Sequence, residues 1–207
     1  MTHGQMWLVR HGESEMAVQK RLSGHNDSPL TEAGRGHAEA ASRTVRALSA
    51  RTGRRPTRVV SSPVARAWQT GEIIAESLGL PLSACADLAE TDFGAWDGLS
   101  SPEIVAGWPE LIVRWRADKS TRPPGGETFA ETAVRVCAAL KEIARAGEEA
   151  VIVVSHSNPI KAAAASALLG VEDRVLEGAH LDFGGTSRFE ISEKGDWTLL
   201  SWNEVNG

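Results

Sequence analysis

Basic side chains follow two apolar stretches of the chain at the points where those stretches end. Arg10 and His11 come directly after the apolar run at residues 6–9, and His156 follows the run at residues 150–154 after one serine. Short apolar runs of this kind are typical of buried strands. Ligands gather at the carboxyl ends of strands in open α/β sheets, so we expect these side chains to share one site.

Two further side chains complete the candidate set. Arg66 lies just beyond a third strand-like run at residues 58–62, and Glu90 lies in the sequence Ala-Glu-Thr-Asp-Phe-Gly. If the segments converge, the site holds two guanidiniums, two imidazoles and one carboxylic acid. Taken singly, each histidine is better explained as a core residue and Arg66 as a surface charge. The set taken together favours a site.

These residue types match the demands of phosphoryl transfer. Arginine presents a planar fork of donors that suits phosphate oxygens. A neutral imidazole nitrogen can attack phosphorus and hold the phosphoryl group covalently. A glutamic acid can protonate the leaving oxygen and then take a proton from the attacking water. Each charge-assisted hydrogen bond is worth roughly 1.5–3 kcal/mol, so four donors can anchor a phosphate without a metal.

Strands must alternate with helices to place these residues. Helical patterns occupy residues 31–49, 64–78, 128–146 and 159–169. Thr31 is the expected N-cap of the first, Pro63 is expected just inside the start of the second, and Gly170 is expected to close the last. The pattern predicts an α/β fold, a three-layer α/β/α sandwich with a mixed, mostly parallel central sheet. Residues 186–191 and 197–202 alternate as a terminal hairpin around a turn at 193–196.

The chain reads as a single domain over residues 1–207, since no linker or repeat divides it. Residues 87–127 are rich in loops, with one helix expected near 103–117 that Gly107 and Pro109 interrupt. A connector of this length is predicted to form a lid or pocket wall. Its tryptophans either line a leaving-group pocket or pack in the core; they are Trp96, Trp108 and Trp115.

Composition narrows the partners. The 207 residues include 22 Lys and Arg against 27 Asp and Glu, a net charge of −5. An acidic balance argues against nucleic acid, which needs a basic face, and the longest apolar runs are too short for a membrane span. The missing signal-peptide pattern and the widely spaced Cys85 and Cys137, expected as reduced thiols, predict a cytoplasmic protein. Monomer and homodimer stay open.

Several motifs occur in an order that resembles the histidine phosphatase superfamily, also called phosphoglycerate mutase-like. The stretch LVRHGES at residues 8–14 is similar to the family signature. The likeness continues through RLSG at 21–24, SPLTEAG at 28–34, SSPVARA at 61–67, ETDFGAWDG at 90–98, PGGE at 124–127 and VSHS at 154–157. Within the family, the chain resembles the alpha-ribazole and broad-specificity phosphatase branch, and most of all the phosphatase half of proteins that also carry a ribonuclease H domain.

The resemblance implies a phosphoglycerate mutase-like fold and a role for each candidate. His11 would be the nucleophile that becomes phosphohistidine, and Glu90 the proton donor. Arg10, Arg66 and His156 would bind the phosphoryl group. Further substrate contacts are expected from Arg21, Ser23, Gly24 and Ser157. One position departs from the family: Ala17 stands where an asparagine is common, so one phosphate donor is replaced.

The implied activity is that of a metal-independent phosphoric monoester hydrolase of the histidine acid phosphatase type, acting on a small phosphorylated metabolite. No cofactor or metal is expected, because no metal-ligand motif occurs. The alternatives are a phosphoglycerate mutase-type phosphoryl transfer and a non-catalytic phospho-ligand binding protein. The chain contains no tyrosine, which counts against the mutase, since the family's mutases usually have a Tyr-Gly pair after the glutamate. Nothing in the sequence names the leaving group.

Overall fold

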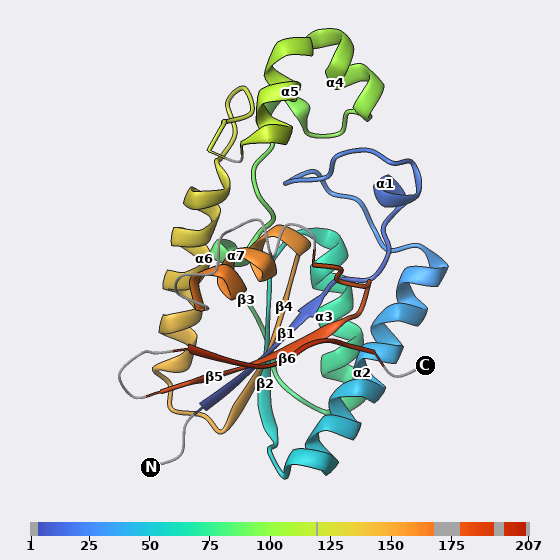
Figure 1. The fold of residues 1–207 in the computed structure, drawn as a ribbon. Helices are drawn as coiled ribbons and strands as arrows, with labels where there is room; N and C mark the ends of the chain where they lie inside the picture. The colour runs from blue at the N-terminus through green and yellow to red at the C-terminus, as the bar shows by residue number, and fades with distance from the viewer. Residues whose placement is uncertain (1–3, 119, 168–178, 193–196, 206–207) are drawn as a thin grey trace.

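The computed structural model describes residues 4–118, 120–167, 179–192 and 197–205, which fold around one mixed sheet (Figure 1). The sheet has the order β3-β2-β4-β1-β5-β6. Its strands are β1 (Gly4–Arg10), β2 (Pro56–Ser61), β3 (Leu82–Ala84), β4 (Ala150–Ser155), β5 (Thr186–Ile191) and β6 (Trp197–Glu204). The first four are parallel, whereas β5 runs antiparallel to β1 and β6 to β5. The mixed, mostly parallel sheet and the terminal hairpin are confirmed.

Helices cover both faces of the sheet (Figure 1). On one face α2 (Glu32–Thr52) and α3 (Ala65–Leu78) pack against Trp7 and Val9 of β1. On the other face α6 (Phe129–Ala144) and α7 (Ser157–Ala167) pack against the alternating residues of the same strand, Met6 and Leu8. Successive side chains of a strand point to opposite faces, so one apolar run supplies both layers of the core. The predicted α/β/α sandwich is confirmed.

The helix termini follow the sequence signals with small differences. The hydroxyl of Thr31 caps α2 by accepting the backbone N–H of Gly34 at 2.9 Å. Pro63 lies before α3 rather than inside its start, because the extended Val64 is the N-cap. The N–H of Val64 bonds instead to the hydroxyl of Ser62 at 3.3 Å. The final helix begins earlier than predicted, and Gly170 and the turn at 193–196 lie outside the described residues.

The expected helix at 103–117 is two helices, α4 (Ser101–Gly107) and α5 (Pro109–Ala117). Trp108 between them has φ −140° and ψ 59°, which no helix accommodates, and Pro109 opens α5 because it has no N–H to satisfy there. Residues 94–117, called the cap below, lie beyond the carboxyl ends of the parallel strands (Figure 1). The cap and its neighbours have a small core of their own, formed by Phe93, Trp96, Ile104 and Ile112.

The segment that follows β1 is held by a close contact between two glycine backbones. A Cβ on Gly12 would lie 2.1 Å from the carbonyl oxygen of Gly34, and a Cβ on Gly34 would lie 2.0 Å from the carbonyl oxygen of Glu13. Only glycine permits this approach. The contact fixes the residues next to His11 against the first turn of α2.

We expect Gly34→Ala to lower the free energy of unfolding by about 1–3 kcal/mol or more, because the added methyl group overlaps backbone that cannot move away. Gly36→Ala in the same helix is the control, since its Cβ would meet nothing within 4 Å. Alanine there is expected to raise stability by roughly 0.5–1 kcal/mol. Urea unfolding of both variants measures this, and a shift of the same sign in the two would contradict the argument.

Candidate active site

The ends of three parallel strands meet at one edge of the sheet. Arg10 of β1 is in register with Ser155 of β4, and Ser61 of β2 is in register with Val154. The backbone N–H of His11 bonds to the carbonyl of Ser155 at 3.0 Å, so the nucleophile candidate continues the ladder by one residue. The structure thus brings the predicted strand ends together.

His11 is fixed in one neutral form. Its Nδ1 lies 2.7 Å from the carbonyl oxygen of Gly12, which can only accept, so Nδ1 carries the proton. The lone pair is then on Nε2, which accepts the Nε–H of Arg66 at 3.2 Å. Burial lowers the pKa of His11 well below 6.5, and the charges of Arg66 and Arg10 lower it further. A buried neutral imidazole with Nε2 as its basic atom can act as a nucleophile.

His156 lies beside His11, with the two rings edge to face and their centroids 5.0 Å apart. Its side chain is fully buried, and its Nε2 is 2.9 Å from the hydroxyl of Ser62. Because that hydroxyl already accepts the N–H of Val64, its proton can go to Nε2, which leaves the proton of the ring on Nδ1. Burial and the charge of Arg66 lower the pKa of His156 well below 6.5.

Arg66 is 1% exposed and is held by a loop at residues 23–26. One terminal nitrogen donates to the carbonyls of Ser23 and Gly24, each at 2.9 Å, and the other donates to the carbonyl of Asn26 at 3.3 Å. Ser23 and Gly24, predicted to contact substrate, therefore position the guanidinium through their backbones. Helix α3 supplies Arg66 from its first turn.

Arg10 lies against the aromatic ring of Phe183, with its guanidinium carbon 4.0 Å from the ring centroid. The same ring is 6.0 Å from the ring of His11 and stacks on His37 of α2 at 5.7 Å. Phe183 was not identified from the sequence. It lies 172 positions beyond His11, and only the antiparallel pairing of β5 with β1 brings that part of the chain to the site.

Three buried polar groups of this cluster have no hydrogen-bond partner among the described residues. They are Nε of Arg10, Nδ1 of His156 and the hydroxyl of Ser23, in the loop that holds Arg66. Buried polar groups are nearly always paired, so unpaired donors beside two guanidiniums mark a place for an acceptor. Two guanidiniums and an unpartnered N–H donor fit a phosphoryl group.

Glu90 is buried, and its carboxyl accepts the backbone N–H of Thr91 at 2.9 Å and that of Asn158. Burial raises its pKa above 4.5, although these hydrogen bonds and the nearby arginines oppose the shift. Burial therefore outweighs the positive charge of the arginines in setting the pKa of Glu90. A carboxylic acid that stays protonated to higher pH can protonate a leaving oxygen.

Arg135 of α6 holds the backbone around Glu90. Its guanidinium donates to the carbonyls of Asp87, Ala89 and Glu90 at 2.8–3.1 Å. It also pairs with both carboxylate oxygens of Glu127 at 3.0 and 2.7 Å. Nothing in the spacing of the sequence distinguishes Arg135 from the other arginines, because its partners lie up to 48 positions away.

The remaining predicted substrate contacts are Arg21 and Ser157, and Ala17 is the position that differs from the family. Arg21 is bonded to the carbonyl of Gly98 at 2.8 Å and to Glu103 at 2.9 Å, so the structure places its guanidinium with the cap and not with the phosphate-binding groups. Ser157 opens α7 directly after His156. Ala17 lies in the short helix α1 (Glu15–Val18).

The part of the chain that the structure describes contains no group of three or more His, Cys, Asp or Glu residues able to hold a metal ion. Cys85 and Cys137 are free and half-buried. Within the same residues, no helix has the length and apolar character needed to span a membrane.

The family profile described as histidine phosphatase superfamily, branch 1, matches residues 6–205. The chain belongs to this superfamily. Among curated relatives, the bifunctional protein Rv2228c of Mycobacterium tuberculosis is 40% identical over 99% of the chain and 55% of its own length. The chain thus spans about half the length of that relative. A 2,3-bisphosphoglycerate-dependent phosphoglycerate mutase of Methylobacterium radiotolerans is 35% identical over 75% of the chain and 74% of its length.

Solved structures show the same likeness. Mycobacterial glucosyl-3-phosphoglycerate phosphatase, solved with VO3, is 28% identical, with a TM-score of 0.82 over 96% of this chain and 98% of that one. The alpha-ribazole phosphatase of Shigella flexneri shares the fold, with a TM-score of 0.83 over 97% and 96% of the two chains at 24% identity.

We expect both site histidines to stay neutral at pH 6.5, where a histidine with an ordinary pKa is half protonated. Burial and adjacent guanidiniums disfavour the imidazolium ion at both positions. Ring nitrogen NMR shifts followed from pH 8 to pH 5 measure this. His11→Gln and His156→Gln assign the signals. A titration midpoint at or above 6.5 for either ring would contradict the geometry.

Proposed function

We propose that the protein is a phosphatase that hydrolyses a small-molecule phosphomonoester through a phosphohistidine on His11, with Glu90 as general acid and base. The observation that carries the proposal is the neutral imidazole of His11, whose basic Nε2 faces the guanidinium of Arg66 at 3.2 Å among buried donors. The membership of the superfamily and the phosphatases among its solved structures support the same reaction class.

In the first step, Nε2 of His11 forms a bond to phosphorus as the bond from phosphorus to the leaving oxygen breaks. Glu90 gives its proton to that oxygen, and the leaving group departs as an alcohol. Arg10, Arg66 and His156 bind the phosphoryl oxygens. Before substrate binds, Nε–H of Arg66 donates to Nε2 of His11, and a phosphoryl oxygen then takes the place of that acceptor. Fixed donors placed where charge develops stabilise the transition state.

In the second step, the Glu90 carboxylate takes a proton from water, and the oxygen of that water attacks phosphorus. The bond from phosphorus to Nε2 breaks, and inorganic phosphate leaves with the starting state restored. The arrangement needs no metal, and the proposed substrate is a small phosphorylated metabolite met in the cytoplasm.

Phosphate release from phenyl phosphate in the presence of EDTA tests the proposal. Wild-type protein is expected to be active and to yield acid-labile, alkali-stable phosphate on His11 after rapid quenching with radiolabelled substrate. His11→Ala should lose at least a thousandfold in kcat, whereas His180→Ala, an exposed histidine paired with Asp182, should not. Full activity in His11→Ala would refute the nucleophile, and loss with EDTA would refute the metal-independent reaction.

The pH dependence of kcat/KM tests the acid. The acid limb should follow the ionisation of His11, well below pH 6.5, and the alkaline limb that of Glu90, above 4.5. Glu90→Gln should remove the alkaline limb and slow alkyl phosphates by roughly 10²–10⁴-fold. The first turnover of p-nitrophenyl phosphate should be slowed far less, because its leaving group departs without a proton. The exposed Glu39→Gln serves as the control, and equal losses on both substrates would contradict the role of Glu90.

The competing function is transfer of the phosphoryl group to a second hydroxyl, as the mutase relative suggests. Both reactions use the phosphohistidine, so only the fate of the group separates them. Phosphorus NMR of 3-phosphoglycerate with the enzyme is expected to show inorganic phosphate without 2-phosphoglycerate. Isomerisation without release would favour the mutase.

A further inference from the structure

A cavity lies next to the residues that hold the carboxyl of Glu90, and its lining contains none of the groups proposed to bind the phosphoryl oxygens. Thr91 and Asn158, whose backbone N–H groups bond to that carboxyl, both line it. An acid that protonates the leaving oxygen must lie within hydrogen-bonding reach of it. The leaving oxygen must therefore approach Glu90, which makes this neighbouring cavity a candidate place for the rest of the leaving group.

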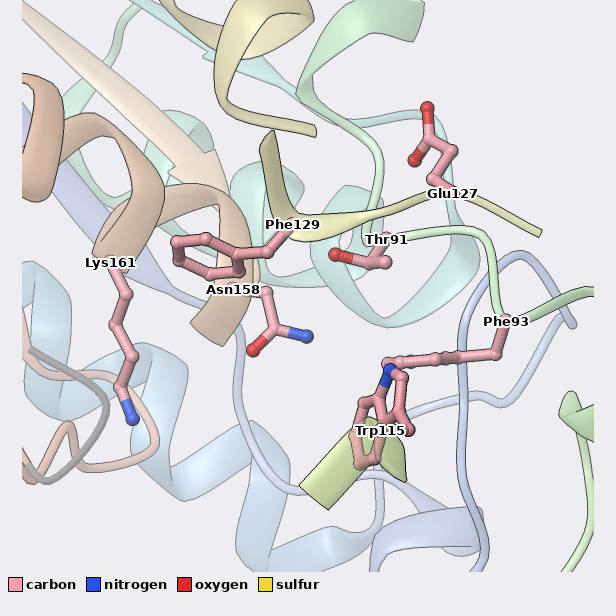
Figure 2. A pocket seen from close by; sticks show the side chains of 7 residues that line it. All are labelled: Thr91, Phe93, Trp115, Glu127, Phe129, Asn158 and Lys161. Carbon is pink, nitrogen blue, oxygen red and sulfur yellow. The ribbon is translucent and has the colours of Figure 1, made fainter. Parts of the chain in front are cut away.

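Three aromatic rings from separate parts of the chain form the apolar wall of the cavity. Phe93 precedes the cap, Trp115 comes from α5 and Phe129 from the first turn of α6. Figure 2 shows the three rings around the amide of Asn158, with Lys161 on the opposite side from Phe93. Trp115 contacts Phe93 edge to face at 6.3 Å and the buried Trp96 at 5.6 Å, so its indole is held in place.

Charge in the cavity wall comes from two side chains. Glu127 is already paired with Arg135 and accepts the backbone N–H of Asp92 at 3.0 Å, and Figure 2 shows its carboxylate directed away from the rings. Lys161 of α7 brings an ammonium group to the wall.

The size of the cavity limits what it can hold. Its volume is about 180 Å³. A cavity of roughly 150 Å³ lined by apolar side chains holds one benzene ring. One six-membered ring with small substituents therefore fills it.

Resting on the phosphatase activity proposed above, we propose that this cavity is the leaving-group subsite and that it takes phosphomonoesters of a single compact ring. The ring lies with an apolar face against Trp115 and Phe129, and the amide of Asn158 bonds to a ring substituent. Aryl rings and pyranoses share this chemistry, since each presents an apolar face of the same size.

The test compares kcat/KM for phenyl phosphate and glucose 1-phosphate with that for the acyclic glycerol 3-phosphate and for phosphocholine. At least one ring substrate should exceed glycerol 3-phosphate by about tenfold or more, the effect of one well-packed aromatic contact. Comparison of the two ring substrates separates an aryl from a sugar preference. Equal values for ring and acyclic substrates, or a preference for phosphocholine, would overturn the proposal.

Variants locate the effect in the cavity. Trp115→Ala and Phe129→Ala should lose about tenfold on the preferred ring substrate and less than threefold on glycerol 3-phosphate. Trp115→Phe should recover most of the loss, which excludes a general collapse of the cap. Val113→Ala, on an exposed face of the same helix, is the matched control. Equal losses on ring and acyclic substrates would overturn the subsite while leaving the phosphatase reaction intact, and absence of activity on every ester would refute the proposed function itself.

Discussion

A single buried guanidinium, that of Arg66, connects the segments on which the site depends. Its charge is removed from water, and it is compensated by three carbonyls of the loop at 23–26 and by Nε2 of His11. The loop is fixed in turn by Asp97 of the cap, whose carboxylate accepts the backbone N–H groups of three successive loop residues at 2.7–3.0 Å. The cap, the loop and His11 are therefore one connected network, and a change in any of them alters the position of the others.

The chain has a net charge of −5, but the candidate site is positively charged. Two guanidiniums and two buried imidazoles converge with a single buried carboxyl, and burial raises the pKa of that carboxyl. The carboxylates that make up the acidic surplus lie outside this set of residues. An anionic substrate responds to the local field, so an acidic protein can still bind a phosphoryl group.

Much of the fold was predictable because its signals are local. The continuous apolar run of β1, the Thr31 cap of α2 and the helical pattern of α3 each depend on neighbours within a few residues. The errors arose where the local signal was ambiguous. Proline is common at the start of a helix, but Pro63 lies before α3 because the extended Val64 occupies the N-cap position. The two helices of the cap separate at Trp108, whereas the sequence predicted one helix over 103–117 that Gly107 and Pro109 interrupt.

The amino-acid sequence by itself determined which chemical groups lie at the ends of the strands. Each apolar run and the polar residues that follow it are consecutive in the chain, so both can be identified without the fold. The sequence placed Arg10, His11 and His156 there, and the order of its motifs added Arg66 and Glu90. Only the tertiary structure decided how those groups behave. The tautomer of His11, the direction of each pKa shift, the diversion of Arg21 to the cap and the aromatic wall beside Glu90 all depend on burial and on partners distant in the chain. Such contacts, 55 positions apart for His11 and Arg66, exist only once the layers have packed.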